Sequence, residues 1–363
     1  MKVMTILGTR PEIIRLRCVI DVLDASCDHL LVHTGQNFDH RLSQLFFDDL
    51  GLREPDVHMG VRGDGFAEQV GQIVTRAGAL LADHRPDALL VLGDTNSGLA
   101  AVVAKRMGIP VFHMEAGNRC YDDRVPEEVN RRVIDHSSSV LLPYTHRSAE
   151  NLVREGIERN RVFVTGNPIK EVLDRYSDRI ASSTALADLG LAAGGFMLAT
   201  VHRAETVDVE PRLRSLAASL GRVVEKHGMP VVCSLHPRTA DRMRSYGVSA
   251  DSVRFVEPLG LFDFVALEKA AFCVLSDSGT VQEECCIFGV PTVTLREVTE
   301  RPETIECGSN ILSGIEPESV LSCVDLAVRR RGGWTPPAEY LADNVSETVA
   351  RILIGHLSST GAA

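Results

Sequence analysis

The chain alternates short, continuously apolar runs with longer segments in which apolar residues recur every three or four positions. Continuous apolar runs are typical of parallel strands covered on both faces, and the three-to-four spacing is typical of amphipathic helices. In the first half, the predicted strands are Val3–Leu7, Leu30–His33, Ala88–Leu92, Val111–Met114, Val140–Leu142 and Val162–Thr165. Helical patterns between them include Ile13–Leu23, Arg41–Leu50 and Leu99–Met107. Right-handed crossovers between such strands give a doubly wound sheet.

A seam at Asp178–Gly195, rich in Ser, Ala and Gly, interrupts this pattern before the alternation restarts. The second set of predicted strands is Phe196–Thr200, Val231–Ser234, Val253–Phe255, Phe272–Leu275 and Thr292–Leu295, with helices such as Leu213–Lys226 and Phe262–Ala270. We therefore expect an α/β protein with two Rossmann-like domains facing across a cleft. The first domain covers residues 1–170 and the second residues 171–344, and a C-terminal helix in 345–363 packs back on the first. Ligands of such sheets bind beyond the carboxyl ends of the strands.

Composition narrows the classes of protein that the chain could belong to. It has 363 residues, of which 44% are hydrophobic and 24% charged, so it can form buried cores. The net charge of −11 disfavours a nucleic-acid partner, and the absence of a long apolar run disfavours a membrane span. The N-terminus shows no export signal, and the nine scattered cysteines include no C-x-x-C pair. These features predict a cytoplasmic protein with reduced thiols. The dispersed histidines predict no metal site.

Polar motifs follow several strands in the first half. Gly8-Thr9-Arg10-Pro11-Glu12 follows the first strand, and Arg10 and Arg15 near a helix N-terminus would suit a diphosphate. The alternative is an ordinary strand–helix turn with solvated arginines. Asp94 follows another strand and is either a helix cap or a carboxylate exposed at the sheet edge.

Glu115 and Glu127 complete a set of acids that could meet Asp94 at one edge of the sheet. Glu115 ends a strand, and Glu127 opens a helix after Pro126. Neighbouring carboxyls have their pKa values pushed apart, as paired acid and base chemistry requires. The alternative is that the acids at 127 and 128 only favour a helix N-terminus, and we assign Glu128 to that role.

The second half carries a histidine and an anion-binding turn. His202 follows the first strand of the second domain, where it could act as an acid or base or donate to a phosphate. Ser278-Gly279-Thr280 precedes a helix whose free N–H groups could hold an anion, and Glu284 on that helix could accept from two ribose hydroxyls. Arg296 and Arg301 add cations further on. No Walker A loop or G-x-G-x-x-G is present, which argues against P-loop NTPases and NAD dehydrogenases.

Taken together, these motifs resemble those of one family. G-T-R-P-E-I-I, G-D-T, E-A-G-x-R, P-E-E-x-N-R, H-R-x-E, S-D-S-G-T-x-x-E-E and T-E-R-P-E occur in that order along the chain. The chain is similar over nearly its whole length to the non-hydrolysing UDP-N-acetylglucosamine 2-epimerases. The resemblance implies a glycosyltransferase type B-like fold, a homodimer, a UDP-sugar substrate and no redox cofactor. Some segments look nearer to a branch that acts on modified sugars such as UDP-N-acetyl-L-fucosamine or a 2,3-diacetamido uronate.

The resemblance also implies a mechanism and its residues. Anti-elimination of UDP gives a 2-acetamidoglycal, and UDP adds again after C2 has been protonated on the opposite face. Matching motifs assign catalytic roles to Asp94, Glu115, Glu127 and His202. The positions implied in binding UDP are Arg10, Arg15, His202, Phe264, Ser278, Gly279, Thr280, Glu284 and Arg301.

Three departures from the family pattern stand out. Arg15 replaces a lysine, which keeps the charge but changes its geometry. The segments 36–40 and 235–239 also differ, and in several bacterial members they help to form an allosteric UDP-N-acetylglucosamine site. We therefore expect that site to be weakened or absent. Three rival functions remain open: a glycosyltransferase on the same scaffold, a hydrolysing 2-epimerase, and a non-catalytic UDP-sugar-binding protein.

Overall fold

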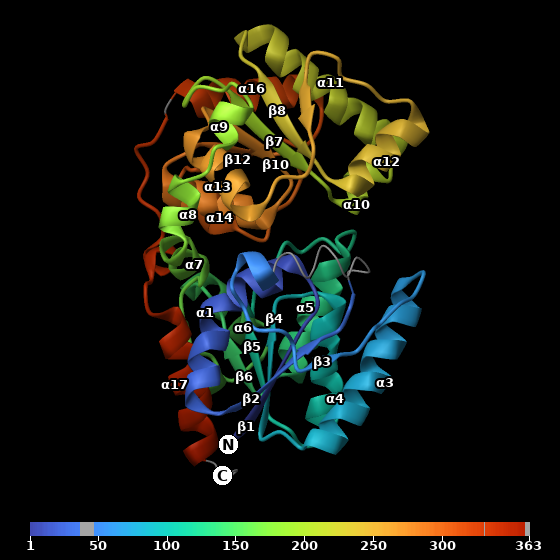
Figure 1. The fold of residues 1–363 in the computed structure, drawn as a ribbon, viewed down its shortest axis with the longest axis vertical. Coiled ribbons are helices and arrows are strands. Elements are labelled where there is room, and N and C mark those ends of the chain that lie inside the picture. Colours follow the sequence, from blue (N-terminus) through green and yellow to red (C-terminus); the bar gives the residue numbers. More distant parts are fainter. Residues whose placement is uncertain (37–46, 330, 360–363) are drawn as a thin grey trace. The chain divides into compact units, whose positions relative to one another are not determined.

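The computed structural model describes residues 1–36, 47–329 and 331–359, and they form two compact units (Figure 1). Unit 1 comprises residues 1–172 together with the C-terminal segment from residue 338, and unit 2 comprises residues 173–337. Each unit contains a six-stranded parallel sheet with helices on both faces. The α/β class predicted from the apolar pattern is confirmed.

Unit 1 is built on the strand order β3-β2-β1-β4-β5-β6. Its strands are β1 (Lys2–Leu7), β2 (Asp28–His33), β3 (Val57–His58), β4 (Ala88–Leu92), β5 (Val111–Met114) and β6 (Val140–Leu142). Its helices are α1 (Arg10–Ser26), α3 (Phe66–His84), η1 (Asn96–Leu99), α4 (Ala100–Arg106), α5 (Pro126–Ser137), α6 (His146–Arg154), η2 (Arg159–Arg161), α7 (Ile169–Arg175), η3 (Ala338–Leu341) and α17 (Val345–Ser359). The helix predicted over 41–50 lies largely outside the described residues, which resume at Phe47.

Both faces of this sheet are covered. Apolar residues of α3, α4 and α5 pack on one face, against strand residues such as Ile6 and Val91. On the opposite side, α17 packs along α1, and the ring of His356 contacts that of Phe112 on β5 at a centroid distance of 5.6 Å (Figure 1). This double cover explains why the strands are apolar throughout.

Unit 2 repeats the same topology. Its sheet has the order β12-β11-β10-β7-β8-β9, with strands β7 (Met197–Val201), β8 (Val231–Leu235), β9 (Arg254–Val256), β10 (Cys273–Ser276), β11 (Thr292–Thr294) and β12 (Asn310–Leu312). Its helices are α8 (Ser177–Ala181), α9 (Ala185–Asp188), α10 (Ala204–Val207), α11 (Glu210–His227), α12 (Pro237–Tyr246), α13 (Leu261–Ala270), α14 (Gly279–Phe288), α15 (Pro302–Glu306) and α16 (Pro317–Arg329). When the strands of each unit are counted along its own chain, both sheets have the order 3-2-1-4-5-6, the Rossmann arrangement.

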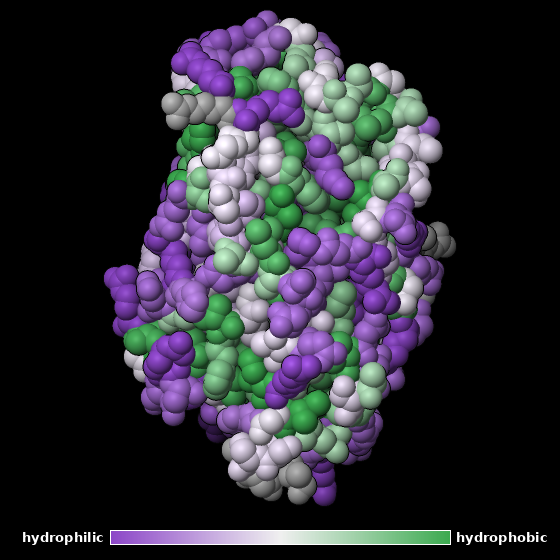
Figure 2. Space-filling view, turned by 90° about the vertical axis from the view of Figure 1, so that its left-hand side faces the viewer, coloured by the Kyte–Doolittle hydropathy of each residue, from purple (hydrophilic) through white to green (hydrophobic). Residues whose placement is uncertain are grey.

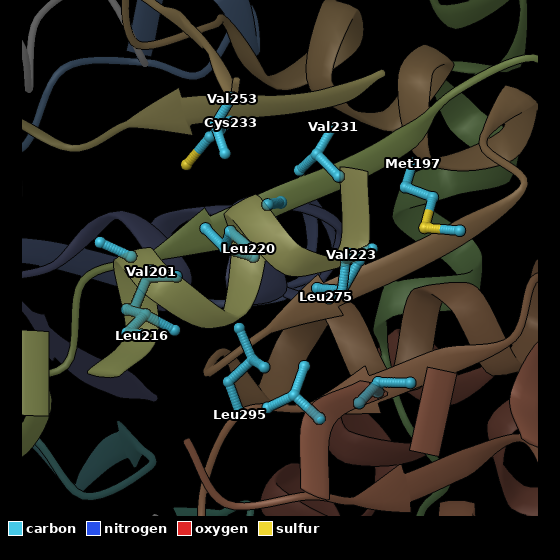
Figure 3. Packing of buried hydrophobic residues seen from close by; sticks show 14 of the residues in the cluster. Met197, Val201, Leu216, Leu220, Val223, Val231, Cys233, Val253, Leu275 and Leu295 are labelled. Atoms are coloured by element: carbon cyan, nitrogen blue, oxygen red, sulfur yellow. The ribbon is translucent and has the colours of Figure 1, made fainter. Parts of the chain in front are cut away.

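Successive residues of one strand in unit 2 enter different cores. Met197 and Val201 of β7 pack with Leu216 and Leu220 of α11 (Figure 3), whereas Leu198 belongs to a second cluster on the other face with Leu267 of α13. The alternation follows from the two-residue period of a strand. Helices on both faces therefore fix the sheet in place.

Several predicted elements differ from the observed ones. Val162–Thr165, predicted as a strand, makes only one bridge, between Leu141 and Val162. The short strands β3 and β12 were not predicted, because β3 has only two residues and β12 begins with the polar Asn310, so neither forms a continuous apolar run. The seam at 178–195 contains the short helices α8 and α9.

The segment around residue 340 belongs with unit 1, although the sequence places it in the second domain. The N–H of Asn167 donates to the carbonyl of Glu339 at 2.8 Å, and the N–H of His146 donates to the Glu339 carboxylate at 3.3 Å. The N–H of Ser346 at the start of α17 donates to Glu171 at 3.1 Å. These backbone contacts tie the returning chain to α6 and α7.

The surface mixes hydrophilic and hydrophobic residues, which are interspersed on the face drawn in Figure 2. Among the described residues, no helix combines the length and the apolar character needed to cross a bilayer.

A close backbone approach in unit 1 can be tested with Gly117→Ala. Gly117 has φ +80°, and a Cβ atom there would lie 2.2 Å from the carbonyl oxygen of Ser148. We expect the free energy of unfolding to fall by about 2–4 kcal/mol, since overpacking adds to left-handed strain. Urea denaturation provides the measurement. Gly156→Ala is the matched control, because it has φ +92° with open space around the Cβ position, and we expect about 1 kcal/mol. Equal losses in the two variants would refute the steric explanation.

Candidate functional site

Polar motifs gather at the carboxyl ends of β1 and β4, the two strands between which the strand order of unit 1 reverses. The carboxylate of Glu12 accepts hydrogen bonds from the N–H groups of Gly8 (3.1 Å) and Thr9 (2.8 Å), and its second oxygen accepts from the Thr95 hydroxyl at 3.1 Å. It therefore joins the loop after β1 to the loop after β4. Burial outweighs these hydrogen bonds and raises the pKa of Glu12 to about 7. Pro11 and the capping contact between Thr9 and Glu12 explain why α1 begins here.

Arg10 and Arg15 both lie on α1, but they have different surroundings. Arg10 is partly exposed in the first turn, and burial lowers its pKa. The sequence predicts Arg15 beside an anionic ligand, and in the structure its buried guanidinium contacts the carboxylate of Glu115, 2.5 Å away. The Tyr144 hydroxyl lies 3.4 Å from the same guanidinium nitrogen.

Glu115 lies directly after β5 in a strained conformation. Its φ is +63°, in the left-handed region that a residue with a side chain rarely adopts. Besides Arg15, the carboxylate accepts from the Tyr144 hydroxyl at 3.3 Å and from the Asn118 amide at 3.2 Å. The side chain is only 9% exposed. Strain held by surrounding contacts is common at functional sites.

Asp94 is held by a cation from α5. Both Nε and Nη2 of Arg131 donate to the same carboxylate oxygen, at 3.0 and 2.5 Å. The Asn130 amide also donates to the Asp94 carbonyl at 3.0 Å, so α5 is fixed against the loop after β4. Glu127 lies in the first turn of α5 and is partly exposed. Asp94 and Glu127 are thus brought to the same edge through α5.

Glu115 and Asp94 lie on adjacent loops. A Cβ atom built at Gly93 would lie 3.7 Å from the Glu115 carboxylate. Glu128 is engaged in other contacts. Its carboxylate accepts from the N–H groups of Cys120 (3.0 Å) and Tyr121 (3.1 Å) and pairs with Arg131. Burial raises the pKa of Glu128, but these hydrogen bonds and the nearby cations outweigh it and lower that pKa.

Unit 2 gathers its motifs at the corresponding strands, β7 and β10. Asp277, fully buried after β10, accepts from the N–H groups of His202 (2.9 Å) and Arg203 (2.8 Å). The Nδ1 atom of His202 also lies 3.2 Å from the Asp277 carboxylate. Protein surroundings lower the pKa of His202, because desolvation of the charged ring outweighs the attraction of Asp277. Its ring lies near that of His236, at a centroid distance of 6.0 Å.

The turn Ser278-Gly279-Thr280 begins α14 next to buried cations. Ser278 is the N-cap residue, and the first N–H groups of the helix point out of its N-terminus. A Cβ atom at Gly279 would lie 3.1 Å from the Glu300 carboxylate, so a larger residue there would require that carboxylate to shift by a few tenths of an ångström. Arg301 at the start of α15 pairs with Glu283 inside α14. The positive end of α14 is thereby fixed beside Arg301.

Two further predicted residues lie on the helices of unit 2. Glu284, on α14, is 4% exposed. Phe264, on α13, is partly buried and packs against the apolar cluster under β7. Arg296 pairs with Glu300 at 3.0 Å, and Glu300 also meets Arg203 at 3.3 Å, so the two arginines share one buried carboxylate.

Sequence reasoning missed the residues that hold the others. Tyr144, Arg131, Asp277 and Glu300 position predicted residues but were assigned no role. Arg131 and Asp277 lie inside the motifs P-E-E-x-N-R and S-D-S-G-T, so their presence was visible but their partners were not. Positions 37–40 of the altered segment lie outside the described residues. Within the described part of the chain, no cluster of three or more His, Cys, Asp or Glu side chains is arranged to hold a metal ion.

The role of Asp277 can be tested with Asp277→Asn. Removing the carboxylate removes an attraction for the charged ring, so we expect the pKa of His202 to fall further below its ordinary value. The loss of a charged acceptor for two N–H groups should also cost about 1–3 kcal/mol of stability. Histidine ring NMR titration and urea denaturation measure the two effects. Asp325→Asn removes a surface carboxylate paired with Lys226 and is the control. An unchanged His202 titration would contradict this assignment.

Comparison with known proteins places this arrangement in context. A family model described as UDP-N-acetylglucosamine 2-epimerase matches residues 23–354. A UDP-N-acetylglucosamine 2-epimerase of Methanocaldococcus jannaschii is 37% identical, over 97% of this chain and 99% of the relative. A UDP-2,3-diacetamido-2,3-dideoxy-D-glucuronate 2-epimerase of Pseudomonas aeruginosa is 35% identical, over 88% of this chain and 90% of the relative.

Solved structures of such epimerases are also similar to this chain. The crystal structure of the Methanocaldococcus jannaschii UDP-GlcNAc 2-epimerase, in complex with UDP-GlcNAc and UDP, matches with a TM-score of 0.92 and 36% identity, over 98% of this chain and 99% of that one. The UDP-N-acetylglucosamine 2-epimerase from Rickettsia bellii matches with a TM-score of 0.90 and 39% identity, over 99% and 97% of the two chains.

Proposed function

Since this chain belongs to the UDP-N-acetylglucosamine 2-epimerase family, we propose that it is a non-hydrolysing epimerase that interconverts UDP-N-acetylglucosamine and UDP-N-acetylmannosamine. The observation that carries this proposal is the set of carboxylates at one sheet edge of unit 1. Asp94 and Glu115 are each paired with a different arginine there, and Glu127 lies on the helix that holds Asp94. A reaction that removes and returns a proton needs an acid and a base held in different surroundings.

The proton at C2 is not adjacent to a carbonyl, so its direct removal is difficult. In the proposed reaction, a carboxylate takes the C2 proton while the bond from C1 to the UDP oxygen breaks, and UDP leaves with the electron pair. This anti-elimination leaves a 2-acetamidoglycal. An acid then protonates C2 on the opposite face, and UDP adds again to C1. No net oxidation occurs, so the reaction requires no redox cofactor.

We assign the proton transfers to Asp94, Glu115 and Glu127. The arginine contacts support this assignment because they fix the direction of two of the carboxylates. Arg15, which the sequence predicts as a contact of UDP, is also assigned to orienting Glu115 through their ion pair. Its replacement of a family lysine gives Glu115 a guanidinium partner with several donors.

Nucleotide binding is assigned mainly to unit 2. Ser278, Gly279 and Thr280 at the N-terminus of α14 would accept the diphosphate on free N–H groups, with Arg10, Arg301 and His202 contributing donors. Glu284 would accept from the ribose hydroxyls, and the ring of Phe264 would lie near the uracil.

The sugar itself has a second candidate. Identity of 35% to an epimerase of a 2,3-diacetamido uronate supports the same C2 inversion on a modified UDP-HexNAc. A panel of UDP-N-acetylglucosamine, its 6-deoxy relative and its 2,3-diacetamido relatives, followed by proton NMR in heavy water, would distinguish them. Deuterium at C2 without an acceptor excludes a glycosyltransferase or a pure binding protein, and intact UDP-sugar products exclude a hydrolysing enzyme.

Assembly and location belong to the same proposal. We propose a cytoplasmic homodimer, as the family resemblance implies, with no nucleic-acid or membrane partner. The nine cysteines, all free thiols, suit a reducing compartment. Light scattering coupled to size exclusion would test the dimer.

The carboxylate assignment is tested by Asp94→Asn and Glu115→Gln. We expect each substitution to reduce turnover by about 10²–10⁴, the usual range for acid and base catalysis. UDP affinity should change much less, since the nucleotide is assigned to other residues. C2 deuterium exchange measures turnover, and calorimetry with UDP measures affinity. Glu150→Gln, on the exposed side of α6, is the control. Near-normal exchange in both variants would remove these residues from the mechanism.

The nucleotide assignment is tested by Glu284→Ala. Loss of charged hydrogen bonds to the ribose should weaken UDP binding by about 1.5–3 kcal/mol. Calorimetry measures the change. The difference in affinity between the wild type and Glu284→Ala should be smaller for deoxyuridine diphosphate, because this nucleotide lacks one of the ribose hydroxyls. Equal affinity of the variant and the wild type would leave Glu284 as a structural residue only.

A further inference from the structure

A second buried carboxyl lies against Glu284. Glu268 on α13 is fully buried, and its carboxyl meets that of Glu284 on the neighbouring helix α14. Two acceptor-only groups repel each other unless a proton lies between them. The pair therefore needs a shared proton to be stable inside unit 2.

No other group in the described structure donates to Glu268. Neither of its carboxyl oxygens receives a hydrogen bond from any donor among the described residues. Its neighbours belong to an apolar cluster that includes Leu267, Val281 and the Cys285 thiol. Burial first, and then the charge of Glu284, raise the pKa of Glu268 well above its ordinary value. An ionised Glu268 would have no compensation here.

Among the titratable groups on the surrounding elements, Glu284 is the one whose charge affects Glu268. Of the α14 and β10 thiols, Cys285 has a pKa raised well above its usual range and Cys273 one of about 12, so both stay protonated. On α8, Arg179 stacks over the Phe262 ring at 4.0 Å.

Two further charged side chains on these helices contact other groups. Asp188 on α9 accepts from the Thr184 hydroxyl. On α13 itself, Lys269 lies over the Phe288 ring, 5.5 Å from its centroid. Each is thus engaged with a partner other than Glu268.

We propose that Glu268 is a positioning residue that keeps its proton and donates it in a hydrogen bond to the carboxylate of Glu284, and thereby orients that carboxylate for the ribose hydroxyls. The ribose role of Glu284 rests on the proposed function above. The pair carries a single negative charge. Since hydroxyls donate hydrogen bonds to carboxylates, this negative charge strengthens the hydrogen bonds that Glu284 would accept from the ribose.

The proposal predicts different effects for two substitutions of similar size. Glu268→Gln keeps an N–H donor toward Glu284 but cannot titrate, so UDP affinity at pH 7 should stay within about three-fold of the wild type. Glu268→Met keeps the volume and removes the donor. UDP should then bind about ten-fold more weakly, the factor that corresponds to one hydrogen bond to a charged group. Calorimetry with UDP measures both.

The pH dependence of stability gives a readout that packing alone would not change. The pKa of Glu268 is raised in the folded state, so its stabilising contribution is complete below the unfolded value and is lost as pH rises through the folded value. Urea denaturation of the wild type should show this loss, whereas Glu268→Gln should show a flatter profile. Infrared difference spectroscopy should detect a protonated carboxylic acid in the wild type that is missing in Glu268→Gln.

Different results would refute the role of Glu268 and the epimerase function. Unchanged UDP affinity in a folded Glu268→Met variant, or a wild-type pH profile and acid band in Glu268→Gln, would overturn it. If Glu268→Met does not fold, the two measurements on Glu268→Gln still decide. Absence of C2 exchange in the wild type would refute the epimerase function instead, and the stability and infrared results on the ligand-free protein would stand unaffected.

Discussion

The reversal of strand order in each sheet is the constraint on which the other features depend. Between β1 and β4, and again between β7 and β10, the chain leaves neighbouring strands toward opposite faces of the sheet. The loops after those strands therefore diverge at the carboxyl edge, which is where ligands of such sheets bind. Glu12 and Asp94 lie beyond one such pair of strands, and His202 and Asp277 beyond the other. The shared topology explains why four motifs separated along the chain become two local sets.

Within each set, buried ion pairs and backbone hydrogen bonds fix the polar side chains. Asp277 uses a buried carboxylate to hold the N–H groups of two residues after β7. Arg131 and Arg15 each fix one carboxylate of unit 1. A buried ion pair adds little net stability after desolvation, but removal of one partner leaves an uncompensated charge. These pairs therefore contribute direction more than stability, which suits the proton transfers proposed for these carboxylates.

Much of this could be predicted from the sequence, for a physical reason. A buried parallel strand of four or more residues, such as Ala88–Leu92, leaves a continuous apolar run, and the motif after it must lie at the carboxyl edge. The two-residue strand β3 leaves no such run. Side-chain partners were not predictable, because Arg15 and Glu115 are 100 positions apart and only the fold brings them together. The pairing of Glu268 with Glu284 was equally hidden, since a glutamate inside an amphipathic helix is usually a surface residue.

Arg15 shows how one substitution can change a site without removing its charge. A lysine would offer Glu115 a compact ammonium on a flexible stem, whereas the guanidinium is planar and carries several fixed donors. In this chain the guanidinium lies 5.6 Å from the centre of the Tyr144 ring and contacts Glu115 directly. The Tyr144 hydroxyl reaches the same carboxylate. Two groups thus define the orientation of one oxygen on a residue whose backbone is already strained at φ +63°. Under the proposed role of Glu115 in proton transfer, this rigidity favours a fixed geometry at C2 over adaptability, so we expect discrimination among sugars to come from groups at C3, C4 and C6 rather than from movement of Glu115.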